Sequence, residues 1–282
     1  MEFRSTVIRG HSGPIYALAL DSDFVYSTSS DGFVTRWSLE TAEQDKFTVK
    51  LDSPAYVMHL RNGILFVGST NGTVRAINLK TKLLIWENNR FGKPIFSMCW
   101  SEMLDLLLVG DAEGNLFAID IVGKSTWYFP LDSGKIRVIR EFGDHFYVGS
   151  QDGKLRCFQL PSLNEIWCAS AHEGSIYAIL KLDSGLVSAG FDGKVSIIND
   201  QGNIRKSFPV HYQSVYGVEK FEDGFVTCSK DKTIKVWDQN WNILKKIEEI
   251  EGHTKSINAI ASAENVFITA GDDKTIRIWN KI

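Results

Sequence analysis

The amino-acid sequence predicts an all-β fold, a seven-bladed β-propeller with four antiparallel strands in each blade. Two observations support this prediction: a turn motif that recurs about every forty residues, and short β-rich runs on both sides of the turns. A repeat of this length, built from several short strands, is typical of a propeller in which each repeat forms one blade. Composition agrees, because 44% hydrophobic and 23% charged residues are ordinary values for a globular chain.

Each repeat is marked by an acidic or amide residue that is followed by glycine or lysine. Asp-Gly and Asn-Gly pairs favour positive φ angles, so each predicts a tight turn between two strands. The steps between successive turns are 40, 42, 39, 40, 39 and 42 residues. The seven turns are Asp31-Gly32, Asn71-Gly72, Glu113-Gly114, Asp152-Gly153, Asp192-Gly193, Asp231-Lys232 and Asp273-Lys274.

The segments that flank the turns are rich in β-branched and aromatic residues. Residues 24–26 precede one turn and residues 234–237 follow another, and both runs have the composition of strands. No long segment has a helical period, and no linker or break in composition interrupts the repeats. We therefore expect residues 1–282 to form a single propeller domain.

The two ends of the chain predict how the last blade is completed. Only two residues follow Asn280, so the last repeat lacks its outer strand. Residues 3–8 stand before a Gly-His pair in the same way as residues 247–250 do. We expect the N-terminal segment to supply the missing strand, which would remove an exposed sheet edge.

Four repeats share histidine, a hydroxyl residue and aspartate at a fixed spacing, and three of them add a tryptophan. The first set is separated by 16, 4 and 6 residues. With the Gly-His pairs and endings such as Val236-Trp237-Asp238, this pattern resembles the WD-repeat family, and the resemblance implies a hydrogen-bonded tetrad within each such blade. The sets are His11, Ser27, Asp31 and Trp37; His211, Thr227, Asp231 and Trp237; His253, Thr269, Asp273 and Trp279; and His172, Ser188 and Asp192, where Ile198 replaces the tryptophan.

Serine, histidine and aspartate together could also suggest a hydrolase. A catalytic triad occurs once in a chain, with an exposed nucleophile and an oxyanion hole. This set recurs at the blade spacing instead, so we interpret it as structural. The indole N–H would donate to the hydroxyl, the hydroxyl to one imidazole nitrogen, and the other imidazole nitrogen to the carboxylate. The sequence therefore predicts no catalytic residue and no enzyme.

The second, third and fourth repeats lack the tetrad and resemble another propeller repeat. Residues 67–69 read Val-Gly-Ser, and Trp86 follows ten residues after an alanine in the next strand. Related patterns lead to Trp127 and Trp167. They are similar to the quinoprotein, or PQQ-type, repeat, which implies a later tryptophan packed between blades. A quinoprotein-like enzyme or an assembly protein is therefore an alternative function.

One position opens the innermost predicted strand of each repeat, fifteen residues before the turn acid. In the WD-repeat family this position rims the central channel on the top face, and five of the seven residues here are aromatic. Exposed aromatic rings are favoured at interfaces, although rings could also simply fill the channel mouth. The residues are Tyr16, Tyr56, Arg137, Tyr177, Tyr216 and Asn258, with Phe96 two residues out of step.

The residue before each turn acid points toward the same face in the WD-repeat family. It adds Phe191, Lys230 and Asp272 to the expected binding surface. Arg137 and Lys230 would bind acidic groups of a ligand, and Asp272 would bind a basic one. This mixture of charges around an aromatic centre suits a protein loop or peptide.

We therefore expect a protein- or peptide-binding scaffold within a multiprotein complex. The net charge of −3 disfavours nucleic acid as a partner. The chain contains neither an apolar run of membrane-spanning length nor a signal-like N-terminus, and its four cysteines lack metal-ligand spacing. We expect a cytoplasmic monomer without metal or cofactor. A structural subunit that binds through its sides stays open as a further alternative.

Overall fold

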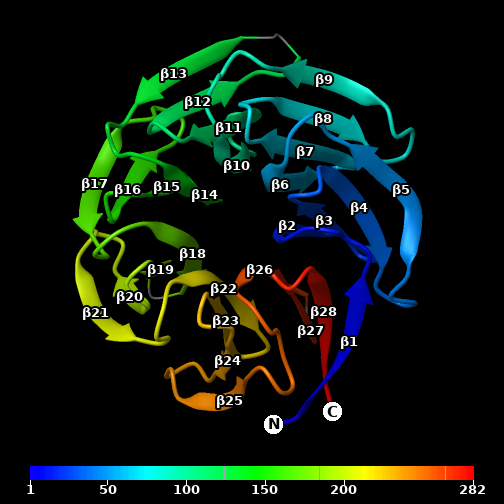
Figure 1. Cartoon of the computed structure of the whole chain (residues 1–282). Helices are drawn as coiled ribbons and strands as arrows, with labels where there is room; N and C mark the ends of the chain where they lie inside the picture. The colour runs from blue at the N-terminus through cyan, green and yellow to red at the C-terminus, as the bar shows by residue number, and fades with distance from the viewer. Residues whose placement is uncertain (123–124, 184, 264) are drawn as a thin grey trace. The chain divides into compact units, whose positions relative to one another are not determined.

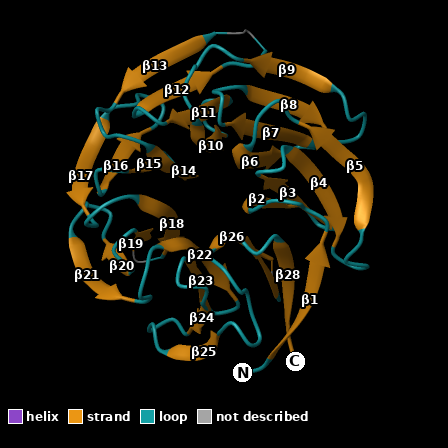
Figure 2. Cartoon of the chain, in the orientation of Figure 1, coloured by secondary structure: helices purple, strands orange, loops and turns teal. Residues whose placement is uncertain are grey.

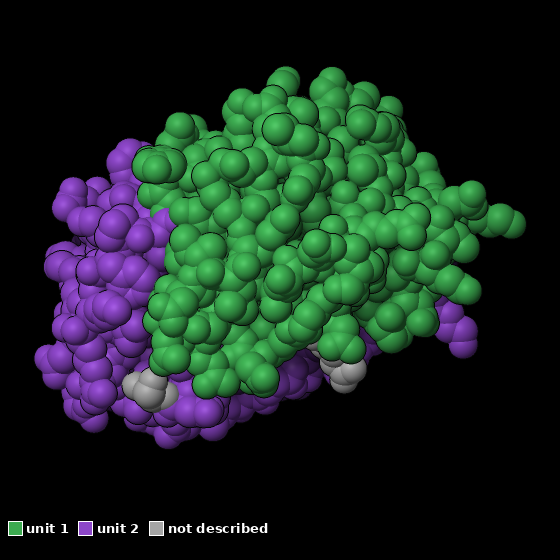
Figure 3. Space-filling view, turned by 90° about the horizontal axis from the view of Figure 1, so that it is seen from below, with its two compact units in different colours: residues 1–56, 211–282 green, residues 57–210 purple. Residues whose placement is uncertain are grey.

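The structure is a computed structural model that describes residues 1–122, 125–183, 185–263 and 265–282. It confirms a seven-bladed β-propeller of four-stranded antiparallel sheets, with no helix among the described residues (Figures 1 and 2). Within these residues, nothing helical is long and apolar enough to cross a membrane. The chain divides into two compact units, coloured separately in Figure 3. Whether residues 1–282 act as a single domain stays a prediction.

The first unit comprises Met1–Tyr56 and His211–Ile282 and contains three blades. Blade 1 consists of β2 (Ile15–Leu20), β3 (Phe24–Ser29), β4 (Phe33–Ser38) and β5 (Gln44–Lys50). Blade 6 consists of β22 (Val215–Phe221), β23 (Gly224–Ser229), β24 (Ile234–Trp237) and β25 (Ile243–Ile247). Blade 7 consists of β26 (Ile257–Ala263), β27 (Val266–Gly271), β28 (Thr275–Lys281) and β1 (Phe3–Arg9).

The second unit, Val57–Val210, contains four blades, and only the first two residues of β6 belong to the first unit. Blade 2 is β6 (Ala55–Arg61), β7 (Ile64–Ser69), β8 (Val74–Asn78) and β9 (Leu84–Asn88). Blade 3 is β10 (Ile95–Ser101), β11 (Leu106–Asp111), β12 (Asn115–Ile119) and β13 (Thr126–Pro130). Blade 4 is β14 (Ile136–Phe142), β15 (His145–Ser150), β16 (Lys154–Gln159) and β17 (Glu165–Ser170). Blade 5 is β18 (Ile176–Leu182), β19 (Gly185–Gly190), β20 (Lys194–Ile198) and β21 (Ile204–Pro209).

The repeated turns join the second and third strands of each blade. The residue after each turn acid has a positive φ angle, which glycine adopts without steric cost and which explains five glycines at this position. Two lysines adopt the same conformation in blades 6 and 7. The seven residues are Gly32, Gly72, Gly114, Gly153, Gly193, Lys232 and Lys274.

The N-terminal strand completes blade 7, as the sequence predicts. β1 pairs with β28 along its whole length, from Phe3 opposite Lys281 to Arg9 opposite Thr275. The ring of Phe3 also contacts Phe267, with 5.3 Å between centroids. The two ends of the chain lie side by side in Figure 1. β1 therefore contributes both backbone pairing and aromatic packing to this sheet.

Candidate functional site

The predicted top-face residues share a backbone feature that the sequence does not reveal. In six blades, the pairing of the innermost strand with its neighbour skips the second residue of the strand. Such a β-bulge leaves one residue outside the ladder and redirects its side chain. The skipped residues are Tyr16, Phe96, Arg137, Tyr177, Tyr216 and Asn258, and Tyr56 is likewise the second residue of its strand.

Phe96 occupies the same structural position as the others, although it is two residues out of step in the sequence. It is skipped between Ile95 and Ser97 like its counterparts. β10 and β11 together run from residue 95 to 111, whereas β14 and β15 run from 136 to 150. The two additional residues lie in the β10–β11 hairpin, and the bulge is unaffected.

In the second unit, three of these residues form a stack that we call the Arg137 stack: Phe96, Arg137 and Tyr177. The guanidinium carbon of Arg137 lies 4.3 Å from the ring centroid of Phe96 and 5.6 Å from that of Tyr177. The ammonium of Lys135 lies 5.5 Å from the Phe96 ring. All four side chains are half-buried. A guanidinium held against two rings is oriented for planar contact with a carboxylate.

In the first unit, the corresponding residues form a phenol and carboxylate group that we call the Tyr16 group: Tyr16, Tyr56, Asn258 and Asp272. The two tyrosine rings meet edge to face, with 5.0 Å between centroids. The amide of Asn258 donates to the carbonyl of Ile15 at 3.0 Å and to Asp272 Oδ1 at 2.7 Å. Burial and the nearby Tyr56 and Asp272 raise the pKa of Tyr16, so its hydroxyl is neutral and can donate or accept a hydrogen bond.

The remaining predicted top-face residues differ in how far they are exposed. Tyr216 packs against the apolar cluster of its own unit and is half-buried. Phe191 is 57% exposed, and Lys230 is also exposed. The backbone N–H groups of Phe191, Lys230 and Asp272 donate to carbonyls just before the innermost strands, which fixes their position beside the strand starts. Lys135 was missed by the sequence reasoning, which considered one residue per strand.

The histidine sets form hydrogen-bonded chains inside single blades. In blade 7, His253 Nδ1 donates to Asp273 at 2.9 Å, His253 Nε2 accepts from Thr269 Oγ1 at 2.8 Å, and Trp279 Nε1 donates to the same oxygen at 2.9 Å. The same contacts occur in blades 1 and 6, and blade 5 has them without the indole. The residues are His11, Ser27, Asp31 and Trp37; His211, Thr227, Asp231 and Trp237; and His172, Ser188 and Asp192.

The ionisation of these sets follows from their burial. Burial lowers the pKa of His253 and of His211 more than their aspartates raise it. For Asp192, burial acts to raise the pKa, but the hydrogen bond from His172 and two backbone N–H groups lower it to about 2. Asp273 is held low in the same way by His253 and Thr275. The aspartates are therefore ionised at neutral pH.

Blades 2 to 4 replace the tetrad with apolar side chains and rely on glycine in the second strand. Leu51, Val67 and Ile77 are buried at the positions of the blade 2 set. A Cβ atom on Gly68 would lie 2.7 Å from Ile95 of the next blade, and one on Gly149 would lie 2.8 Å from Ile176. The glycines therefore let the isoleucine of the following innermost strand pack directly against the backbone.

The later tryptophans of these blades differ in their contacts and in how far they are exposed. Trp167 Nε1 donates to the carbonyl of Asp200 in the next blade at 2.9 Å, and the indole covers Gly202. Trp86 borders the cluster formed by blades 2 and 3. Trp127 is 48% exposed. The packing between blades implied by the PQQ-type resemblance is thus present for Trp167, and Trp86 lies against a cluster to which both blades contribute.

Comparison with protein families agrees with both resemblances. A family model described as outer membrane protein assembly factor BamB matches residues 4–217. The chain belongs to this family. The model of the WD domain, G-beta repeat, matches residues 202–238 and 244–280. Each of these WD matches begins near the outer strand of one blade and ends within one residue of the end of the third strand of the next.

The BamB-family match covers more of the chain than the sequence reasoning assigned to it. It includes blades 1 and 5, which carry histidine sets, as well as blades 2 to 4. No curated protein gives a significant match. The crystal structure of the computationally designed Ika8 protein aligns with a TM-score of 0.76 over 97% of this chain and 98% of that chain, with 17% identity. At this identity the likeness shows the fold alone.

The quinoprotein reading of this family would imply a quinone held with calcium. Calcium is bound by several carboxylate and carbonyl oxygens. Among the described residues, no three His, Cys, Asp or Glu side chains gather where they could hold a metal ion. These residues therefore do not provide the acidic donor set for such a group.

Proposed function

We propose that this chain is a non-enzymatic scaffold that binds a protein or peptide through the bulged residues at the starts of its innermost strands. One observation carries the proposal: the same backbone distortion recurs in six blades and presents an aromatic side chain in four of them, an arginine in one and an asparagine in one. A bulge is a local distortion that families retain next to binding sites. The match to WD repeats, a propeller class that serves as an interaction scaffold, is consistent with it.

The two groups of residues favour different chemistry in the partner. The Arg137 stack and Lys135 present positive charge on aromatic faces, which suits an aspartate or glutamate side chain. The Tyr16 group presents phenol hydroxyls beside Asp272, which suits a lysine, an arginine or a backbone N–H. A folded loop or extended peptide with both kinds of side chain is the partner that we propose. Membership of a multiprotein complex, a cytoplasmic location and a monomeric state belong to the same proposal.

Affinity capture from native extract tests this proposal. We expect wild-type protein to retain a defined partner, and Tyr177→Ala to lose it while keeping the circular dichroism spectrum and melting temperature. Tyr128→Ala is the matched control, because Tyr128 is 55% exposed on the outer strand β13 of the same unit. Equal capture by wild type and Tyr177→Ala would refute the proposed surface.

The control also addresses binding through the sides. The outer strands β9 and β13 expose Leu84, Ile85, Trp127 and Tyr128, each by about half of its surface. Exposed apolar residues that form one contiguous patch mark interaction surfaces. Loss of the partner with Tyr128→Ala alone would favour the structural subunit that binds by these strands.

The family match favours a second candidate, a role in assembly. The family description names an outer membrane protein assembly factor, and the match covers residues 4–217 of this chain. Cell fractionation distinguishes this candidate, because an assembly factor of that kind must be found with the envelope. Addition of the quinone and calcium, read by absorbance and melting temperature, tests the quinoprotein-like enzyme.

A further inference from the structure

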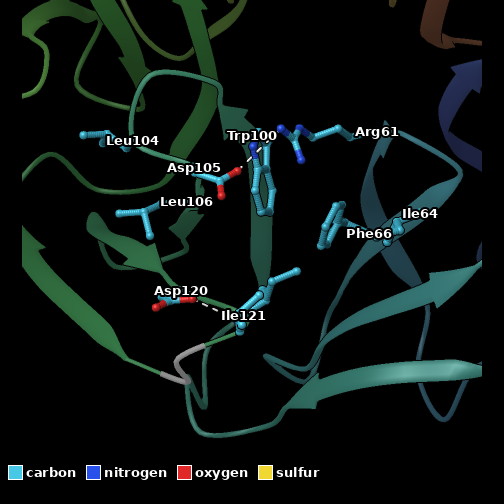
Figure 4. A pocket seen from close by; sticks show the side chains of 10 residues that line it. Arg61, Ile64, Phe66, Trp100, Leu104, Asp105, Leu106, Asp120 and Ile121 are labelled. Carbon is cyan, nitrogen blue, oxygen red and sulfur yellow. Dashed lines mark hydrogen bonds and ion pairs between the residues drawn. The ribbon is translucent and has the colours of Figure 1, made fainter.

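The second unit contains a cavity of about 520 Å³ that the proposed scaffold function does not use (Figure 4). It lies at the end of β10, whereas Phe96 marks the start of the same strand. Its apolar wall includes Ile64, Phe66, Leu104 and Leu106 from blades 2 and 3. This volume is within the range of about 300–1,000 Å³ that is typical of ligand sites.

Trp100 lines this cavity beside Phe66 and Arg61. Its ring stacks on Phe66, with 5.5 Å between centroids, and the guanidinium of Arg61 lies 4.3 Å from the ring centroid. The side chain is only 6% exposed. Its indole N–H is buried and has no hydrogen-bond partner among the residues that the structure describes. Buried donors are nearly always paired in proteins, so this N–H is the group of the cavity that needs an acceptor, which it reaches when an occupant displaces the side chains that cover it.

The charges around the cavity favour a positively charged occupant. Arg61 Nε and Nη2 donate to Glu102 at 2.8 and 2.7 Å, so its charge is already matched. Asp105 and Asp120 also line the cavity. The Asp105 side chain is 80% exposed and lies 3.5 Å from Arg61. The mouth therefore has more negative than positive charge, and it would attract a basic group.

We propose that this cavity binds a short peptide segment of a partner, in which an apolar residue is next to a lysine or arginine. The apolar side chain occupies the pocket beside Phe66 and Leu106. A backbone carbonyl of the segment accepts the hydrogen bond from Trp100 Nε1. The basic side chain reaches Asp105 at the mouth. Two adjacent residues of a peptide supply all three groups, so one segment satisfies the apolar wall, the buried donor and the acidic mouth.

Nuclear magnetic resonance with two capped dipeptides tests this inference. Acetyl-Phe-Lys-amide is the probe, and acetyl-Phe-Glu-amide is its charge-reversed counterpart. The indole N–H signal of Trp100 is identified by its loss in Trp100→Phe. We expect acetyl-Phe-Lys-amide to move this signal downfield in a saturable way, and the indole signals of Trp37 and Trp279, which are bonded in their tetrads, to stay in place. Asp105→Asn should weaken the binding about two- to fivefold at low salt.

Asp132→Asn provides the matched control for the charge. Asp132 belongs to the same unit, is exposed, and has a φ angle of 47°, close to the 54° of Asp105. The inference is overturned if acetyl-Phe-Lys-amide produces no saturable shift of the Trp100 signal, or if acetyl-Phe-Glu-amide binds equally well. It is also overturned if Asp132→Asn weakens binding as much as Asp105→Asn does. Equal binding of 2-phenylethylammonium, which has no carbonyl, would assign the pocket to small amines and refute the peptide.

Discussion

The hydroxyl at the centre of a tetrad makes two buried hydrogen bonds at once, and Thr269→Val removes it. Thr269 is fully buried in blade 7. Its oxygen accepts the indole N–H of Trp279 at 2.9 Å and donates to His253 Nε2 at 2.8 Å. Valine has nearly the same shape, so the substitution leaves no sizeable cavity. Its effect should therefore report the loss of hydrogen bonds.

The size of the effect follows from the number of groups left without a partner. Removing the oxygen leaves one buried donor and one buried acceptor, and each such group costs about 1–3 kcal/mol. We expect Thr269→Val to lower the free energy of unfolding by about 2–4 kcal/mol. Ser188→Ala in blade 5 is the matched control, because Ser188 contacts His172 at 2.9 Å and the position of the tryptophan is occupied by Ile198. The control should cost about 1–2 kcal/mol, the share of one imidazole.

Urea unfolding followed by circular dichroism measures both variants, with the slope of the transition checked against wild type. A double-mutant cycle with Trp279→Phe isolates the indole bond, and the coupling free energy should be about 1 kcal/mol or more. The reasoning fails if Thr269→Val costs no more than Ser188→Ala, or if the cycle gives no coupling.

Three further predictions concern the fold. Deletion of residues 1–8 removes the strand that pairs with β28, so the melting temperature should fall by many degrees; an unchanged melting curve would contradict the role of β1. Acidification from pH 7.5 to 3 should lower the free energy of unfolding in two stages. The folded-state pKa of His253 is low, so below pH 6.5 the unfolded chain binds a proton at this histidine before the folded chain does. The folded-state pKa of Asp273 is also low, so below pH 3.8 the unfolded chain binds a further proton at this aspartate first. The first stage should amount to at most about 1.4 kcal/mol per pH unit for each histidine and should weaken in His253→Gln. Gly149→Ala should cost about 1–3 kcal/mol in urea unfolding, because its Cβ would lie 2.7 Å from Val138 of the same blade and 2.8 Å from Ile176 of the next; a neutral result would show that these side chains can move aside.

Much of the fold could be predicted because each repeat carries its own turn signal. The positive φ angle needed after each turn acid restricts the residue, and the restriction is visible as a series of Asp-Gly pairs. Blade 3 shows where this reasoning is incomplete. There the buried carboxylate that accepts the turn N–H groups is Asp111, two residues before the turn acid: it accepts from the N–H of Glu113 at 2.8 Å and from that of Asn115 at 2.9 Å.

The candidate site was predictable in position but not in geometry. Counting from the turns located Tyr16 and Arg137, because strand lengths are nearly constant from blade to blade. The bulges themselves have no mark in the sequence, since the skipped residues are tyrosine, phenylalanine, arginine and asparagine and include no glycine. The cavity around Trp100 was missed for another reason: its walls come from two blades, and only packing brings Phe66 and Leu106 together.

The two kinds of blade leave the bulged position outside the contacts that hold the sheets together, which bears on its proposed role. In the tetrad blades, the bonds of His253 and its partners hold the strands of one blade together. In the PQQ-type blades, Gly149 lets Ile176 of the following blade pack against its backbone, so the stabilising contact lies between blades. The bulged residue is part of neither arrangement, because it stands one place after the buried aliphatic residue and outside the ladder. Its identity therefore differs between blades, from tyrosine to arginine to asparagine, without changing either arrangement, and under the proposed function these differences match the partner.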